Sequence, residues 1–298
     1  MNAPVALFLY NRPLHAQRVL KSLAACDEAS KTELYIYSDG ALLPEHAKDV
    51  AEVRRICHSA TGFAAVHVIE EEENHGIAGS CIKGVNEVLS KFSKVIVIDD
   101  CLEMSPFFLK YMNSALNYYQ NYGILSISGY TPPIEMPRGY DSSTFVMHRT
   151  CPWGWGTWRE QWQKIDWEVP SFDAFIRNAA KLKEFNSCGH ELWQTLLRWK
   201  LGEIDDWSIR FTYAGYLFNE PTVYPRKSLV RYVGSSASVV EGTCLMPLAA
   251  NVGLSNFASG IAPNAEIVEM FRTVYNMPIT TRILCNLKRL KYIFFDKK

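Results

Sequence analysis

One pair of adjacent carboxylates follows a strongly apolar run. Asp99 and Asp100 come directly after the residues VIVI at 95–98, and Cys101 follows them. Carboxylates at the end of a buried strand are costly unless positive charge lies beside them, and a divalent metal that bridges a diphosphate supplies such charge. An alternative is an acidic turn that only caps a helix, because Ser105 and Pro106 predict a helix that begins just after the turn.

A second pair of carboxylates, Asp205 and Asp206, precedes the apolar pattern of Trp207, Ile209 and Phe211. A carboxylate in this place can accept the proton of an attacking hydroxyl as a general base. It can equally be the N-cap of a helix, and the two roles are compatible because a cap holds the side chain still.

Further polar residues follow the other predicted strands. Strand-like runs cover 4–10, 33–38, 64–70 and 94–98, and helix-like segments lie between them at 14–26, 45–58 and 77–91. This alternation predicts an α/β fold with a mainly parallel sheet flanked by helices, in which ligands bind beyond the carboxyl ends of the strands. We therefore expect one crevice to contain these strand-end residues: Tyr10, Asn11, Arg12, Asp39, Asn74, Gly76, Asp99 and Asp100.

Several segments resemble one glycosyltransferase family. The run VIVIDDCLEMSPFFLKYM is similar to the metal-binding segment of GT-A transferases of the branch related to N-acetylglucosaminyltransferase I. LFLYNRPLHAQRVLKSL, YSDG, NHGIAGSCIKGVNEV, CPWGWGTWREQW and IDDWSIRF resemble further segments of bacterial members in the same order, over roughly residues 4 to 235. The resemblance implies a GT-A-like, Rossmann-type mixed sheet and a family 2-like sugar transferase.

The resemblance also implies roles for residues. It places the strand-end residues above, together with Lys83, at a nucleotide-sugar site, and it makes Asp205 the preferred base, with Asp206 the other candidate. It implies Mn²⁺ or Mg²⁺ at Asp99, Asp100 and Cys101. However, Cys101 replaces the Asp that normally binds the metal, and a thiolate prefers softer metals. The Trp- and Gly-rich segment implies an acceptor side, formed by Trp153, Trp155 and Trp158, although core packing explains each Trp as well.

Composition restricts the classes of partner. The 298 residues contain 31 basic and 31 acidic side chains, so no overall charge favours nucleic acid, and we expect none to bind. No CxxC pair, GxSxG turn, HExxH helix or P-loop is present, which leaves zinc-knuckle, hydrolase and kinase interpretations without support. Scattered cysteines and the absence of a leader or a long apolar stretch predict a cytoplasmic location.

The predicted organisation is a single GT-A-like domain over 1–280. Residues 1–130 form its nucleotide-sugar half and 131–280 its acceptor half. Residues 281–298 mix apolar residues at helical spacing with six Lys and Arg residues, which indicates a basic amphipathic segment. It either docks on the domain or touches the inner face of an anionic membrane.

The sequence therefore predicts a transferase that moves a sugar from a nucleotide-sugar, by resemblance a UDP-sugar, to a saccharide or lipid-linked glycan acceptor. Bacterial surface polysaccharide synthesis, with inversion at the anomeric carbon, is implied by the resemblance. Two alternatives stay open. One is a degenerate protein that binds glycan or nucleotide without turnover. The other is a sugar-phosphate nucleotidylyltransferase, although Asn11-Arg12-Pro13-Leu14 is not the Gly-rich loop that such an enzyme needs.

Overall fold

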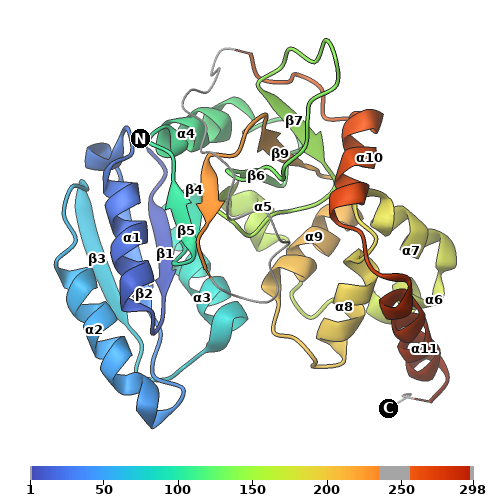
Figure 1. The fold of residues 1–298 in the computed structure, drawn as a ribbon, viewed down its shortest axis with the longest axis horizontal. Coiled ribbons are helices and arrows are strands. Elements are labelled where there is room, and N and C mark those ends of the chain that lie inside the picture. Colours follow the sequence, from blue (N-terminus) through green and yellow to red (C-terminus); the bar gives the residue numbers. More distant parts are fainter. Residues whose placement is uncertain (1, 235–255, 296–298) are drawn as a thin grey trace.

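The fold is known from a computed structural model that describes residues 2–234 and 256–295 (Figure 1). The strands of this part of the chain are β1 (Val5–Leu9), β2 (Glu33–Ser38), β3 (Ala65–Glu70), β4 (Lys94–Asp99), β5 (Leu102–Met104), β6 (Ser126–Ser128), β7 (Thr144–Met147), β8 (Trp155–Trp158), β9 (Thr222–Pro225) and β10 (Val230–Tyr232). The α-helices are α1 (Pro13–Ala24), α2 (Ala47–His58), α3 (Gly76–Lys91), α4 (Phe108–Tyr118), α5 (Arg159–Gln163), α6 (Phe172–Arg177), α7 (Ala179–Phe185), α8 (Leu192–Lys200), α9 (Trp207–Phe218), α10 (Ala265–Val274) and α11 (Ile279–Phe295).

Most strands join one mixed sheet, which in the described residues has eight strands in the order β3-β2-β1-β4-β8-β6-β9-β7. The first four are parallel, whereas β8 runs antiparallel to both of its neighbours, β4 and β6. A small second sheet pairs β5 with β10. This is the predicted GT-A-like arrangement of a mixed sheet flanked by helices. The large sheet combines strands from 1–130 and 131–280, whose division into a donor and an acceptor half stays a prediction.

Alternate residues of the parallel strands pack against different helices. In β2, Leu34 and Ile36 belong to the cluster that contains α1 and α2, while Tyr35 and Tyr37 pack with α3. Ile96 and Ile98 of β4 likewise face away from Val95 and Val97. Because successive side chains of a strand point to opposite faces, both faces of the sheet are covered, and the strands are apolar nearly throughout.

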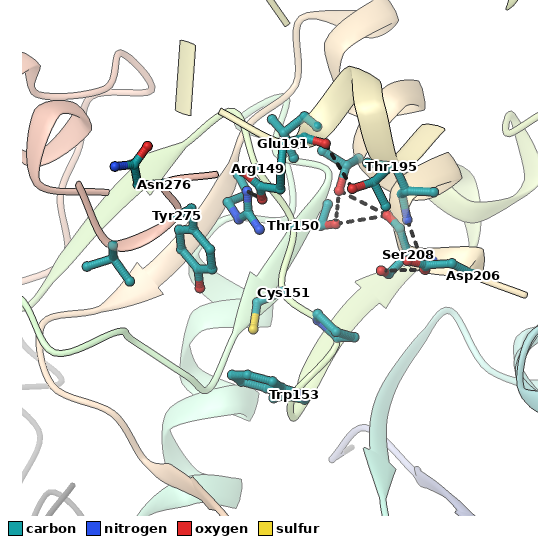
Figure 2. A pocket seen from close by; sticks show the side chains of 15 residues that line it. Arg149, Thr150, Cys151, Trp153, Glu191, Thr195, Asp206, Ser208, Tyr275 and Asn276 are labelled. Atoms are coloured by element: carbon teal, nitrogen blue, oxygen red, sulfur yellow. Dashed lines mark hydrogen bonds and ion pairs between the residues drawn. The ribbon is translucent and has the colours of Figure 1, made fainter. Parts of the chain in front are cut away.

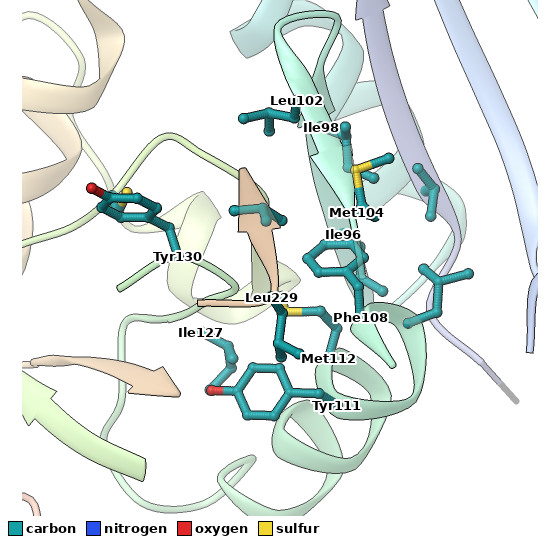
Figure 3. Close-up of a cluster of buried hydrophobic side chains, with 14 of the residues drawn as sticks. Ile96, Ile98, Leu102, Met104, Phe108, Tyr111, Met112, Ile127, Tyr130 and Leu229 are labelled. Atoms are coloured by element: carbon teal, nitrogen blue, oxygen red, sulfur yellow. The ribbon is translucent and has the colours of Figure 1, made fainter. Parts of the chain in front are cut away.

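The predicted strands and helices of the first half agree with the structure to within a few residues, but the segment after Asp100 differs. Leu102–Met104 forms β5, and α4 begins at Phe108 rather than at Pro106. The backbone N–H of Ser105 donates to the carbonyl of Leu229, next to β10, at 2.8 Å. This pairing keeps the chain extended through Ser105, so the helix starts later. Its side chains then fill the core together with Ile96 and Ile98 (Figure 3).

The chain after β8 builds a mainly helical region, at the right of Figure 1, around a separate apolar cluster of α6–α9 and Cys285 of α11. No helix among the described residues has the length and apolar character needed to cross a bilayer.

We predict that two leucines of α1 respond differently to the same substitution. Leu23 is fully buried and Leu14 is 66% exposed. Leu23→Ala leaves a cavity and is expected to lower the free energy of unfolding by about 2–5 kcal/mol, whereas Leu14→Ala changes it by less than about 0.5 kcal/mol. Urea denaturation of both variants measures the difference, and equal effects would contradict the assigned orientation of α1.

Candidate functional site

A cleft of about 720 Å³ lies at the carboxyl ends of the parallel strands. It brings together residues from the ends of β1, β2 and β4, from the start of α3, and from the turn before α9. The predicted site residues that line it are Tyr10, Arg12, Asp39, Asn74, Gly76, Asp99, Asp100, Cys101, Trp153 and Asp205. Asp205 is more than a hundred residues away from Asp99 in the sequence, so this grouping depends on the tertiary fold.

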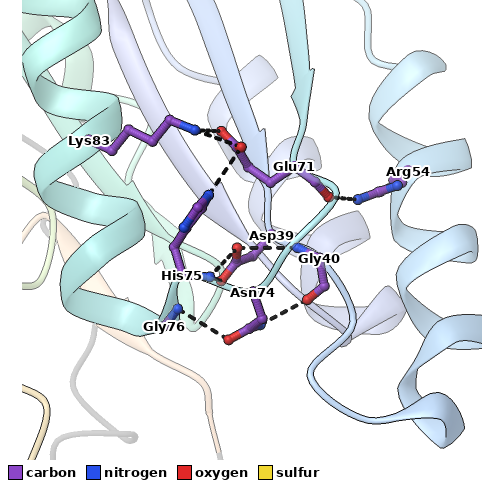
Figure 4. Close-up of polar contacts among 8 residues, drawn as sticks. All are labelled: Asp39, Gly40, Arg54, Glu71, Asn74, His75, Gly76 and Lys83. Carbon is purple, nitrogen blue, oxygen red and sulfur yellow. Dashed lines mark hydrogen bonds and ion pairs between the residues drawn. The ribbon is translucent and has the colours of Figure 1, made fainter.

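The floor of the cleft beside β2 is held by a polar network (Figure 4). The carboxylate of Asp39 accepts hydrogen bonds from the backbone N–H groups of His75 and Gly40. Asn74 donates to the carbonyl of Gly40 at 2.8 Å and accepts from the N–H of Gly76 at 3.1 Å. A Cβ on Gly40 would lie 2.6 Å from the Glu72 carbonyl oxygen, so only glycine permits this close passage of two chains. The network fixes the loops that carry Asp39 and Asn74.

Asp205 contacts the start of α3. Its Oδ2 accepts a hydrogen bond from the backbone N–H of Ala78 at 3.2 Å, although α3 has no side-chain cap at His75. The positive end of a helix favours a carboxylate. Gly76 has φ = +70°, and a Cβ there would lie 3.0 Å from the same Oδ2. Glycine therefore allows both the turn and the approach of Asp205.

The neighbouring Asp206 has a different environment. Its backbone is extended, with φ = −136° and ψ = 110°, so its side chain points away from that of Asp205. The Asp206 carboxylate accepts from the N–H groups of Ser208 and Ile209 and from the Ser208 hydroxyl, and thus caps α9. It does not line the cleft described above. Of this pair, Asp206 is therefore the helix cap, and Asp205 is the member that lines the cleft.

The negative charge of the acidic turn is partly compensated by Arg12. Arg12 makes a bidentate contact with Asp100, donating from Nε to Oδ2 at 2.9 Å and from Nη2 to Oδ1. Asp100 is almost fully buried, whereas the Arg12 side chain is 42% exposed. Burial, together with the charge of Asp100, raises the pKa of Asp99 to about 7, with Arg12 opposing the shift. At neutral pH Asp99 is therefore only partly ionised, and the charge of Asp100 is paired with that of Arg12.

These residues do not form a ready site for Mn²⁺ or Mg²⁺. Both oxygens of Asp100 are taken by Arg12. Burial, reinforced by Asp99 and Asp100, raises the pKa of the Cys101 thiol far above its ordinary value, so it stays protonated and a poor ligand for a hard cation. In residues 2–234 and 256–295, no three His, Cys, Asp or Glu side chains are grouped as metal ligands. The donor set as it stands does not fit the implied metal.

Some predicted site residues lie elsewhere. Lys83 projects from α3 and pairs with Glu71 at 2.7 Å, in contact with the network of Figure 4 rather than with the cleft. Asn11 is on the loop after β1 but does not line the cleft. Trp155 and Trp158 are strand residues of β8 with at most 5% exposure, so they pack in the core and cannot contact an acceptor. This part of the acceptor prediction is wrong, because Gly156 between these two tryptophans belongs to a buried strand.

The cleft also contains residues that the sequence did not single out. Ser80 lines it, and its buried hydroxyl has no hydrogen-bond partner among the residues that the structure describes. Leu42 and Ile77 line it too, yet they are 63% and 72% exposed.

A second cavity of about 440 Å³ adjoins the first, and Trp153 lines both (Figure 2). Its walls come from the loop before β8, the starts of α8 and α9, and the end of α10. Arg149 stacks on the ring of Tyr275 at 3.6 Å and forms an ion pair with Glu191 at 2.5 Å. Polar side chains that line this cavity are Thr150, Glu191, Thr195, Asp206, Ser208, Thr212 and Asn276.

Comparisons with known proteins give only distant structural likeness. No protein-family description and no curated protein sequence matches the chain. Among solved structures, a crystal structure of S. aureus TarS 1-349 is 15% identical with a TM-score of 0.42, over 77% of this chain and 60% of that one. S. aureus TarS has 16% identity and a TM-score of 0.43, over 79% of this chain and 37% of that one.

A third structure is the mannosyltransferase PcManGT from Pyrobaculum calidifontis in complex with GDP-Man and Mn²⁺. It is 12% identical with a TM-score of 0.42, over 100% of this chain and 88% of that one. This chain thus spans less than two thirds of either TarS structure. At these values the likeness assigns neither substrate nor activity, which must be argued from the residues of the cleft.

The raised pKa of Asp99 leads to a pH-dependent prediction. The folded protein keeps the Asp99 proton up to about pH 7, while the unfolded chain releases it near 3.8, so this group destabilises the fold increasingly between these pH values. We compare the free energy of unfolding of Asp99→Asn with that of the wild type at each pH. This difference is expected to be about 1–3 kcal/mol more in favour of the variant at pH 8 than at pH 4.

Urea unfolding at both pH values in EDTA measures this difference. Asp141→Asn, which removes an exposed carboxylate, is the control for loss of charge alone. A difference between the Asp99 variant and the wild type that does not change with pH would contradict the prediction.

Proposed function

We propose that this chain is a glycosyltransferase that transfers a sugar from a nucleotide-sugar, a UDP-sugar, to a hydroxyl of a saccharide or lipid-linked glycan acceptor. The observation that carries the proposal is the cleft in which Asp205 faces the strand-end residues Arg12, Asp39 and Asp99. A donor site at the strand ends and a fixed carboxylate opposite it are the two parts that a sugar transfer with a single displacement needs.

The donor would bind at the carboxyl ends of β1, β2 and β4. The exposed apolar side chains of Leu42 and Ile77 suit the faces of a nucleobase, and Asp39 and Asn74 offer polar atoms beside them. Arg12 is the cation of this cleft with an exposed head, and guanidinium groups bind diphosphates bidentately. We propose that Arg12 contacts the diphosphate and stabilises the charge of the departing nucleotide.

Asp205 is proposed as the general base. It would accept the proton of the acceptor hydroxyl as that oxygen forms its bond to the anomeric carbon and the diphosphate leaves from the opposite face, which inverts the configuration. The N–H of Ala78 fixes Oδ2, and Oδ1 has no hydrogen bond to the described residues, so it is the oxygen that would take the proton. Asp206 is proposed to position Asp205, because it caps α9 and so fixes the turn that carries Asp205.

The acceptor is proposed to occupy the second cavity. Hydroxyl, amide and carboxylate groups line it, as a saccharide requires, and its volume of about 440 Å³ suits a small sugar moiety. Trp153 lies between the two cavities and offers an aromatic face to the sugar ring nearest the reaction. Surface polysaccharide synthesis in the cytoplasm remains part of the proposal, and the free thiols of the seven described cysteines support a reducing compartment.

Calorimetric titration of UDP tests the donor site. We expect UDP to bind in EDTA nearly as well as with Mn²⁺, because Arg12 rather than a preformed metal site supplies the positive charge. Arg12→Gln should weaken binding by about tenfold or more. Arg18→Ala, which removes an exposed arginine of α1, the helix that follows Arg12, is the matched control and should bind normally.

Binding that needs Mn²⁺ would contradict the role of Arg12 and show that Asp99 and Asp100 rearrange to ligate metal. Absence of UDP binding under every condition would contradict the transferase proposal and favour a degenerate glycan-binding protein.

Substitution of the two adjacent carboxylates tests the mechanism. Asp205→Asn is expected to lower kcat by about a hundredfold or more with UDP binding unchanged, because it removes the base. Asp206→Asn is expected to change the free energy of unfolding by less than about 0.5 kcal/mol, because the Asn amide oxygen still caps α9, and to have a smaller effect on kcat.

Turnover of a panel of UDP-sugars, measured as release of UDP, supplies the rates, and thermal unfolding supplies the stabilities. In the same assay Trp153→Ala should raise KM for the acceptor more than it lowers kcat. If Asp206→Asn loses activity and Asp205→Asn keeps it, the assignment of the base is wrong.

A further inference from the structure

Helix α11 is attached to the protein by one side only. Cys285 is its buried residue, Arg289 donates to the carbonyl of Ile176 at 2.7 Å, and the Tyr292 hydroxyl donates to Asp173 at 2.7 Å. Lys288 pairs with Glu203 at 2.5 Å. These contacts hold the helix against α6 and α8, at the edge of the molecule near the C-terminus (Figure 1).

The opposite side of α11 is a continuous apolar stripe. Ile279, Ile283, Leu287, Leu290 and Phe294 follow one another at spacings of four, four, three and four residues, which places them on one face of a helix. All are between 46% and 73% exposed, and Leu284 and Phe295 beside them are 59% and 80% exposed. Seven of the fifteen large exposed apolar side chains of the described residues are thus in this helix of 17 residues.

All the charged residues of α11 are basic. The helix contains Arg282, Lys288, Arg289 and Lys291 and no Asp or Glu, so its formal charge is +4. Lys291 is exposed next to the apolar stripe. Lys297 and Lys298, also part of the predicted basic segment, lie outside the described residues. A helix with an exposed apolar face, an exposed lysine at the edge of that face and no acidic residue fits an anionic lipid surface.

We propose that the stripe of Ile279, Ile283, Leu287, Leu290 and Phe294 inserts at the surface of an anionic membrane, with α11 lying in the plane of the interface. The helix is about 25 Å long and would contact lipid along its whole length. A second copy of the chain is a poorer occupant, because pairing two such helices would bring two sets of positive charges together. This inference does not depend on the proposed transfer reaction.

Sedimentation with vesicles tests the proposal. The full chain is expected to bind vesicles of phosphatidylcholine with 30% phosphatidylglycerol, to bind pure phosphatidylcholine at least tenfold more weakly, and to lose affinity at high salt. The triple variant Leu287→Gln, Leu290→Gln, Phe294→Gln should lose at least tenfold in affinity for the anionic vesicles. Leu217→Gln with Phe218→Gln removes exposed apolar side chains of α9 instead and should bind as the wild type does.

Thermal unfolding of the triple variant should match that of the wild type, because the substituted side chains are exposed. The proposal would be overturned if the wild-type protein did not bind anionic vesicles, or if the triple variant bound them as well as the wild type does. A wild-type dimer that becomes a monomer in the triple variant, measured by light scattering without lipid, would also overturn it, since the stripe would then be a self-association surface. UDP titration of the triple variant separates this outcome from a failure of the donor site.

Discussion

The site depends on one hydrogen bond between distant parts of the chain, from the backbone N–H of Ala78 to the carboxylate of Asp205. It joins the N-terminus of α3, which lies beside the carboxyl ends of β1, β2 and β4, to the turn that precedes α9. Two features support this contact: Gly76 allows the close approach, and Asp206 caps α9 directly after Asp205. The carboxylate that faces the cleft is therefore positioned by backbone geometry, which is the kind of preorganisation that makes an acid or base effective.

A second constraint is the balance of charge at the end of β4. Asp100 is buried, and its pairing with Arg12 compensates only part of the cost of burial, which raises its pKa, while the pKa of Asp99 rises to about 7. Such an arrangement lowers stability at neutral pH, because a buried carboxylate without full compensation disfavours the folded state. A bound cationic group, or a ligand that draws Arg12 towards its own phosphates, would change this balance. The acidic turn and Arg12 therefore form one electrostatic unit, and substitutions at either will affect the other.

The sequence predicted most of the residues that line the larger cleft and fewer of those that line the cavity beyond Trp153, for a physical reason. Strand ends such as Asp39 and Asp99 are recognisable because the periods of strands and helices in a parallel α/β fold determine where they meet. Trp155 and Trp158 were misassigned because a strand rich in Trp and Gly has the composition of a binding loop, and only its pairing with β4 and β6 shows that it is buried. Ser80 and the cavity around Arg149 depend on contacts between distant segments, which one sequence does not reveal.

The adjacent residues Asp205 and Asp206 show how the fold separates two tasks over one peptide unit. Because the backbone at Asp206 is extended, the two carboxylates face opposite directions, one into the cleft and one onto the first turn of α9. Asp206 also lines the cavity beyond Trp153, so the same turn borders both hollows. A ligand that extends from one hollow to the other must therefore pass this turn and Trp153. In the proposed function, such a passage would place the junction of donor and acceptor near Asp205, the proposed base.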